Sequence, residues 1–425
     1  MEKQEPRKLK RTIGLWSAVA INVGAIIGGG IFVVTGIVAG LAGSALVISM
    51  IIAGIIAFFT ALGFAELTAW QPVEGSVYAY GKELISPFAG FLAGWMWIIA
   101  NTFTGAAVSL GFAYYLSAAF PGLPSNFIAA GLCLAFMLLN LVGARESANV
   151  NNVLVAIKLA ILGFFVVFGV FHFNGGNFAP FVPLSSGVLF GAFYIFFAYG
   201  GFARIAVVAE EVKDAKRNVP LALLLSLGIS MVVYILVGIV AVGLVSAPTL
   251  ASSNSPLTTA MNSTGSMVAA QIISIGGLVA TASVLLTSIL GVSRMEFSMA
   301  RGKDLPSILA KVHPKFGTPT YAIFATGVVM AVLVLFVDLT SVVALSTFAL
   351  LFNYIITNIS AYRLKTENRR YHQTIHLAGL ATCILLISLV MVEATDSAII
   401  GAIFLVIGTI YYLAKKRLKN NIPKL

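Results

Sequence analysis

The sequence contains little charge, few histidines and almost no cysteine. Its 425 residues include two cysteines and four histidines, and Asp, Glu, Lys and Arg together make up 10% of the chain. Hydrophobic residues make up 59% and mean hydropathy is +1.00. Soluble domains of this length do not reach such values. The composition therefore excludes a soluble globular class and indicates a polytopic membrane protein.

Several kinds of chemistry lack the residues they need. Cys133 and Cys383 both lie inside apolar runs, which predicts small core residues and no disulfide framework. The histidines have no cysteine or carboxylate at metal-ligand spacing, and the sequence lacks the Gly-x-x-x-x-Gly-Lys-Ser/Thr motif of ATP-driven transport. We therefore expect no enzymatic activity, no metal and no cofactor other than transported protons. We also find no filter or ring of pore-lining charges typical of a channel.

Long apolar segments recur from one end of the chain to the other. A helix needs about 20 apolar residues to cross the bilayer. Twelve such spans are predicted, at residues 13–39, 44–69, 85–118, 125–144, 152–172, 186–209, 219–246, 267–298, 319–337, 341–363, 375–392 and 396–414.

Basic residues occur in alternate loops. The net charge is +11, and Lys and Arg cluster in the N-terminal tail, in every second loop and after Lys415. The intervening loops, near 40–43, 119–124, 173–185, 247–266, 338–340 and 393–396, contain neither. The positive-inside rule predicts a cell-membrane protein with both termini in the cytoplasm. This bias explains the positive charge better than a nucleic-acid partner, which we do not expect.

Glycines interrupt the first span and the sixth. Residues 22–36 contain five glycines, and residues 194–209 contain the pair Gly200 and Gly201. In transporters built from two inverted five-helix repeats, the first helix of each repeat is discontinuous and the ligand lies where the breaks meet. The offset of five spans predicts this arrangement, although small residues that permit close helix packing offer a simpler explanation.

We therefore predict an all-α, twelve-helix membrane transporter with a 5+5 inverted-repeat, LeuT-like fold. Its predicted parts are the tail 1–12, the first repeat 13–172, the second repeat 186–363, helices 11 and 12 at 375–414, and the tail 415–425. The last two helices serve packing or dimer contacts in this scheme, and the protein is a monomer or a homodimer.

The two breaks offer complementary backbone groups. A half-helix that starts after the first break presents free N–H groups of Gly28, Gly29 and Gly30, which suit a carboxylate. Carbonyl groups near the breaks suit an ammonium, so the pair predicts an α-amino acid as substrate. The candidate substrate-binding residues are Ile26, Ile27, Gly28, Gly29, Gly30, Phe197, Ala198, Gly200 and Phe202.

Five motifs together resemble permeases of the amino acid/polyamine/organocation superfamily. They are GAIIGGGIF at 24–32, AEL and PVEGSVYAY within 65–80, FAYGGF at 197–202 leading to AEEVK at 209–213, SRMEFSMARGKDLP at 293–306, and HPKFGTP at 313–319. The segment 353–364 is similar to the tenth span of the cationic amino acid transporter branch. The resemblance implies sodium-independent amino acid transport.

Lys158 lies within the fifth predicted span. A charge at membrane depth is costly and is a functional candidate, and a buried amine can lose and regain a proton. In sodium-independent members of the family that this chain resembles, a lysine here takes the place of a sodium ion, and we place Ser283 of the eighth span beside it. The alternative is a lysine that reaches toward the interface.

Arg204 departs from the family pattern, since many relatives carry an acidic residue directly after the Gly-Phe pair. Arginine stays protonated, so Arg204 cannot carry a transported proton and needs an anionic or carbonyl partner. It either pairs with an acidic group of the substrate or excludes cationic side chains, or it forms a structural pair with Glu66, Glu210 or backbone carbonyls.

These inferences favour a secondary carrier that takes up an amino acid with a proton by alternating access within the lipid bilayer. An exchanger of amino acids or polyamines is the alternative.

Overall fold

The computed structural model describes residue 11 and residues 13–73, 75–120, 122–142, 144–207, 209 and 212–420. These residues form helices joined by short loops, and no β-strand occurs among them. The α-helices are α1 (Leu15–Ile26), α2 (Gly29–Ala42), α3 (Leu46–Trp70), α4 (Ser76–Leu84), α5 (Pro87–Ala119), α6 (Ser125–Val142), α7 (Ala144–Val170), α8 (Ser186–Tyr199), α9 (Arg204–Val207), α10 (Ala215–Leu244), α11 (Ala247–Ala251), α12 (Pro256–Asn262), α13 (Met267–Arg301), α14 (Thr320–Phe336), α15 (Leu339–Arg363), α16 (Gln373–Glu393) and α17 (Thr395–Asn420). The 3₁₀ turns are η1 (Gly43–Ala45), η2 (Gly175–Phe178), η3 (Gly200–Ala203) and η5 (Ser307–Ala310).

Within the described residues, ten segments are long and apolar enough to cross a membrane. The first, Leu15–Trp70, joins α1, α2, η1 and α3, and Thr320–Phe336 is a shorter apolar helix. Every predicted span coincides with a helix or with a broken pair of helices. The all-helical membrane class is thus confirmed, whereas the number of crossings stays a prediction.

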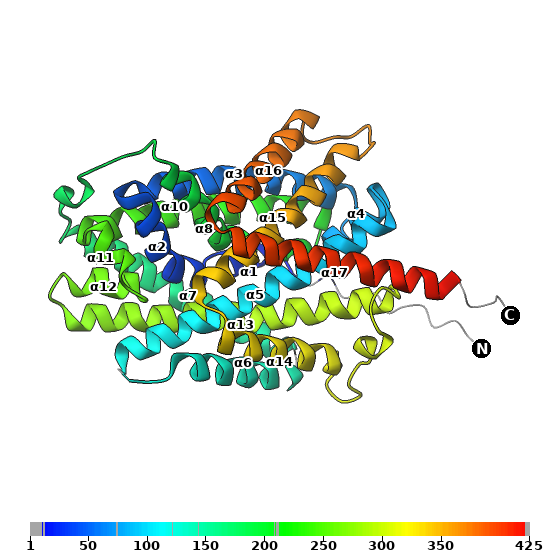
Figure 1. Ribbon diagram of the computed structural model, residues 1–425, viewed down its shortest axis with the longest axis horizontal. Coiled ribbons are helices and arrows are strands. Elements are labelled where there is room, and N and C mark those ends of the chain that lie inside the picture. Colours follow the sequence, from blue (N-terminus) through cyan, green and yellow to red (C-terminus); the bar gives the residue numbers. More distant parts are fainter. Residues whose placement is uncertain are drawn as a thin grey trace.

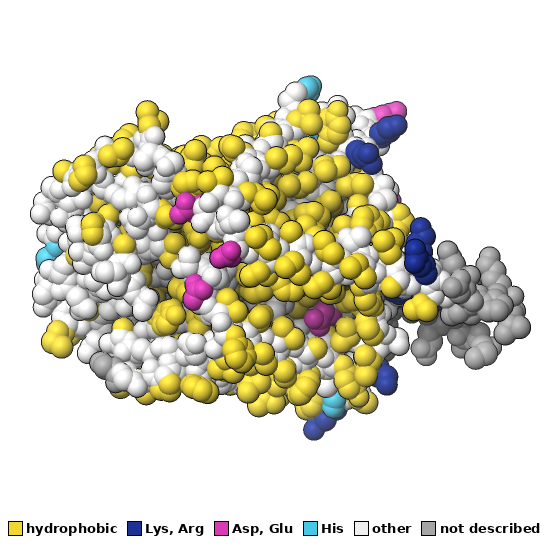
Figure 2. Space-filling model, in the orientation of Figure 1, with side chains coloured by type: hydrophobic (Ala, Val, Ile, Leu, Met, Phe, Trp, Pro, Cys, Tyr) yellow, Lys and Arg dark blue, Asp and Glu magenta, His cyan; other side chains and the backbone are white. Residues whose placement is uncertain are grey.

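The helices form a bundle (Figure 1), and the visible face of its middle part is largely apolar (Figure 2). The long helices α5 and α13 pack against each other, α15 packs on α5, and α2 packs on α8. In α6 and α17 most side chains face outward, and exposed residues such as Phe127 and Ile410 are apolar. An apolar exterior over a packed interior is what a surrounding bilayer requires.

Basic side chains gather at one end of the bundle. Figure 2 shows Lys and Arg at the end where α17 finishes, and none on the visible face of the opposite end. This asymmetry agrees with the alternation of basic loops along the sequence.

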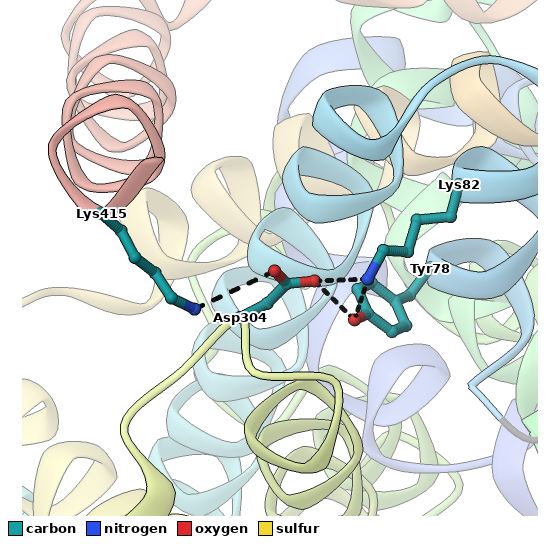
Figure 3. A network of polar contacts seen from close by, with 4 residues as sticks. All are labelled: Tyr78, Lys82, Asp304 and Lys415. Atoms are coloured by element: carbon teal, nitrogen blue, oxygen red, sulfur yellow. Dashed lines mark hydrogen bonds and ion pairs between the residues drawn. The ribbon is translucent and has the colours of Figure 1, made fainter. Parts of the chain in front are cut away.

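A polar network at this end joins three elements (Figure 3). The Asp304 Oδ2 atom accepts hydrogen bonds from the Tyr78 hydroxyl at 2.6 Å and from Lys82 Nζ at 2.7 Å. Lys415 Nζ of α17 lies 4.0 Å from Asp304 Oδ1. Burial and then the hydrogen bond to Asp304 raise the pKa of Tyr78 far above its usual value, so Tyr78 remains a donor. The network connects α4, the loop after α13 and α17.

Candidate functional site

The first helix is interrupted between Ile26 and Gly29. Ile27 and Gly28 lie outside both helices. Gly28 is the N-cap residue of α2, and no side chain among the described residues caps this helix start. The first N–H groups of an α-helix have no partner within the helix. The start of α2 therefore presents backbone donors and the positive end of the helix dipole toward the break.

The sixth predicted span contains a 3₁₀ turn and not an open break. Helix α8 ends at Tyr199, the 3₁₀ turn η3 follows directly, and α9 begins at Arg204. The Gly200 N–H donates to the Phe197 carbonyl, and the Arg204 N–H donates to the Gly201 carbonyl. This segment keeps a continuous, more tightly wound backbone.

The two irregular segments touch each other through glycines. A Cβ atom on Gly30 would lie 2.7 Å from the Cα atom of Ala198, and one on Gly201 would overlap the carbonyl oxygen of Ala25. Close packing and helix interruption therefore act at the same glycines, and the two explanations drawn from the sequence do not exclude each other.

Side chains replace the hydrogen bonds that the breaks remove. In a continuous helix the Gly24 and Ile26 carbonyls would accept from residues 28 and 30. Here Lys158 Nζ donates to the Gly24 carbonyl at 2.6 Å, and the Tyr234 hydroxyl lies 2.7 Å from the Ile26 carbonyl oxygen. Unpaired carbonyls in hydrocarbon are costly, so these donors stabilise the interruption.

The same compensation occurs at the second segment. The Tyr234 hydroxyl also lies 2.9 Å from the Ala198 carbonyl oxygen, and the Tyr354 hydroxyl donates to the Gly200 carbonyl at 3.0 Å. The sequence predicted carbonyls near these positions that an ammonium could use. Each already accepts one hydrogen bond, so a ligand would use the second lone pair of the oxygen.

The side chain of Lys158 reaches the first break. The side chain is fully buried in α7, and its Nζ atom donates to the Gly24 carbonyl and, at 2.9 Å, to Ser283 Oγ of α13. The structure therefore places Lys158 beside Ser283, the neighbour that the family resemblance predicts. It does not place Lys158 at an interface, because the amine ends among α1 and α13.

Among the described residues, the partners of Arg204 are hydroxyl groups and none is acidic. Its guanidinium donates to the side chains of Thr287 and Ser288, both on α13. Glu66, one proposed partner, instead accepts hydrogen bonds from the backbone N–H groups of Arg370 and Tyr371. Glu210, the other acidic candidate, lies outside the described residues.

A small cavity of about 20 Å³ lies between the two irregular segments. That space suits one or two water molecules, so a bound amino acid requires the site to widen. The lining comprises Ala25, Ile26, Gly28, Gly30, Asn101, Thr104, Val108, Phe197, Ala198, Gly200, Gly201, Arg204, Val284 and Leu350.

Three predicted substrate residues lie outside this lining. Ile27 is fully buried, and a Cβ atom on Gly29 would lie against Thr281 and Val108. The Phe202 ring packs on Phe64 and Tyr354. These three residues pack against neighbouring side chains and do not line the cavity.

Four polar residues of the site were missed from the sequence. Asn101 and Thr104 of α5 line the cavity, and Tyr234 and Tyr354 bind the carbonyls at the breaks. Asn101 and Thr104 are three residues apart and so share one helix face in an apolar span, which is a usable signal. Nothing comparable distinguishes the two tyrosines.

Comparison with known proteins identifies the family. Residues 13–423 match the family model described as amino acid permease. The chain is 31% identical to the methylthioribose transporter of Bacillus subtilis, over 86% of this chain and 84% of that protein. It is 30% identical to the branched-chain amino acid permease BcaP of the same organism (85% and 82%) and 29% identical to the cationic amino acid transporter 5 of Arabidopsis thaliana (91% and 71%).

Family membership accounts for the motifs around both irregular segments, and the names of these relatives differ in the solute that they carry. The chain belongs to the amino acid permease family, within the amino acid/polyamine/organocation superfamily.

Proposed function

We propose that this protein is a secondary active carrier that takes an amino acid into the cell together with a proton. The observation that carries the proposal is the meeting of three features at one place. The uncapped start of α2, the cavity beside η3 and the buried amine of Lys158 all adjoin the first break. The family model is described as amino acid permease, and two of the three relatives are named for amino acids, the third for methylthioribose.

The substrate α-carboxylate binds at the start of α2 in this proposal. The N–H groups there carry partial positive charge and have no capping side chain among the described residues. The α-ammonium binds the remaining lone pairs of the carbonyls near Ile26 and Ala198, beside the Tyr234 hydroxyl. Both charged groups of an amino acid are then bound by backbone atoms, which makes recognition independent of the substrate side chain.

Lys158 is the proposed proton site. The charged amine donates strong hydrogen bonds to the Gly24 carbonyl and to Ser283 Oγ, and so joins the end of α1 to α13. Loss of the proton weakens both bonds and removes a buried charge. Protonation and the relative position of α1 and α13 are therefore linked, as proton-coupled alternating access requires.

The proposed topology has twelve crossings in a cell membrane, with both termini in the cytoplasm. Residues 15–70 supply two crossings in this scheme and Thr320–Phe336 supplies one. The inverted repeats cover 13–172 and 186–363, so that α1 with α2 corresponds to α8 with η3 and α9.

Uptake by proteoliposomes tests the coupling. Labelled amino acids are offered with and without an inward proton gradient to the wild type, to Lys158→Ala, and to Lys365→Ala as a control on an exposed lysine. We expect the gradient to stimulate uptake by the wild type and the control, and to have no effect on Lys158→Ala. Uptake that needs internal substrate and ignores the gradient would indicate exchange, and the absence of uptake for every amino acid would refute the substrate class.

A further inference from the structure

We infer that Arg204 binds an anionic side chain of the substrate, so that the carrier selects a small amino acid with an acidic side chain. This inference rests on the proposed function and specifies its substrate. Arg204 lines the same cavity as the backbone groups assigned to the α-carboxylate and α-ammonium. The inference depends on the charge that surrounds the cavity.

No carboxylate among the described residues contacts Arg204. Its guanidinium donates to the Thr287 and Ser288 hydroxyls, and these groups accept hydrogen bonds without offsetting the charge. Thr287 Oγ1 itself donates to the carbonyls of Ser283 and Val284, which fixes its orientation. The hydroxyls therefore hold the guanidinium in place, and no carboxylate in the described part of the chain offsets its positive charge.

The acidic side chains of the bundle interior are occupied elsewhere. Glu66 binds backbone N–H groups of residues 370 and 371, Glu296 binds Thr326, and Asp304 binds Tyr78 and Lys82. Among the described residues, Lys158 is a second cation that interacts electrostatically with Arg204.

Both cations donate hydrogen bonds to side chains of α13. Lys158 binds Ser283, and Arg204 binds Thr287 and Ser288, one helical turn further along the same helix. Two like charges in a low-dielectric interior repel each other, and an anion close to Arg204 relieves that repulsion. Fixed positive charge beside a polar cavity thus favours a substrate with negative charge and disfavours a cationic one.

The remaining lining fits a short acidic side chain. Asn101 donates one N–H to the Trp97 carbonyl and keeps a second for a carboxylate, whereas the Thr104 hydroxyl already donates to the Ala100 carbonyl. Arg204 offers a planar group of donors suited to a carboxylate. The cavity holds about 20 Å³, so every amino acid requires the site to widen, and a short side chain requires the least widening. Aspartate and, with more widening, glutamate are the amino acids that match these features.

Uptake of labelled L-aspartate and of labelled L-alanine by proteoliposomes tests the inference. The wild type is compared with Arg204→Gln, Arg204→Lys and the control Arg217→Gln, which changes an exposed arginine. We expect wild-type aspartate uptake to be inhibited by excess glutamate and not by excess arginine. Arg204→Gln should weaken apparent aspartate affinity about ten- to a hundredfold, because a charged hydrogen bond is lost, and should leave alanine uptake equal or higher.

Arg204→Lys keeps the positive charge and should retain part of the aspartate preference, while the control should match the wild type. Size-exclusion profiles establish that each variant is folded. Wild-type uptake of alanine or arginine without aspartate uptake would overturn the inference and leave the carrier function intact. An equal loss of aspartate and alanine uptake in folded Arg204→Gln would also overturn it. If the wild type carries no amino acid, the proposed function itself fails.

Discussion

Both irregular segments contain glycines, but their backbones differ. In the first, the helix is open between Ile26 and Gly29, and the segment itself carries no charge. In the second, the chain passes from α8 through η3 into α9 without a gap, and Arg204 begins α9. The first segment therefore offers open backbone N–H groups for the constant part of a ligand. The second keeps a continuous backbone, shares the Ala198 carbonyl with that constant part, and adds a side chain for the variable part.

The largest effect should follow from removing the contact between the two segments. Gly201→Ala places a methyl group on the carbonyl of Ala25, and backbone cannot move aside as a flexible side chain can. We expect uptake to fall more than tenfold and unfolding in detergent to become easier by about 1 to 3 kcal/mol.

Gly131→Ala is the matched control, because a Cβ atom on Gly131 of α6 would meet no atom within 4 Å. Alanine is favoured over glycine in a helix, so this variant should be as stable as the wild type or more so. Equal damage from both changes would contradict the assigned contact.

A second prediction separates the segments by their tyrosines. Tyr234→Phe leaves the carbonyls of Ile26 and Ala198 without this donor, whereas Tyr354→Phe affects only Gly200. One hydroxyl proton is lost in each variant, but Tyr234→Phe leaves two buried carbonyls without a donor, so we expect a loss in the free energy of unfolding of between about 1 and 2 kcal/mol for Tyr234→Phe and of about 1 kcal/mol for Tyr354→Phe. Thermal unfolding of both purified variants measures the difference, and a reversed order would show that the first break is not the more dependent one.

A third prediction concerns the first break alone. Ser283→Ala removes one of the two acceptors of Lys158 and keeps the bond to Gly24. We expect the proton gradient to stimulate uptake less than in the wild type, with stability reduced by about 1 kcal/mol. Uptake measured across a series of imposed gradients tests this, and an unchanged response would exclude Ser283 from coupling.

The smallest effect is expected far from both segments. Tyr78→Phe removes one donor from Asp304, while Lys82 still pairs with that carboxylate. The site is partly exposed, so the loss should be about 0.5 kcal/mol. Substrate affinity, measured by competition of uptake, should not change.

Much of the helical layout follows from local signals in the sequence. Apolar length located every helix that crosses the bundle, and glycines located both irregular segments, because each property acts within a single span. Lys158 was recognisable because a charge in an apolar run is costly.

The supporting donors could not be found in this way. Tyr234 and Tyr354 are amphipathic residues in apolar helices, and only packing shows that their hydroxyls meet carbonyls more than thirty residues away in the chain. For the same reason the sequence predicts unpaired carbonyls at the breaks and gives no sign that Thr287 and Ser288 bind Arg204.

The hydroxyl of Tyr234 has one proton and two neighbouring carbonyl oxygens, those of Ile26 and Ala198. One proton cannot form two full hydrogen bonds, so the two carbonyls compete for it. If either segment moves away, the bond to the other strengthens, and the net change is smaller than the loss of a whole hydrogen bond. Tyr234 thus lowers the energetic barrier to relative motion of the segments while keeping a donor at the membrane interior throughout.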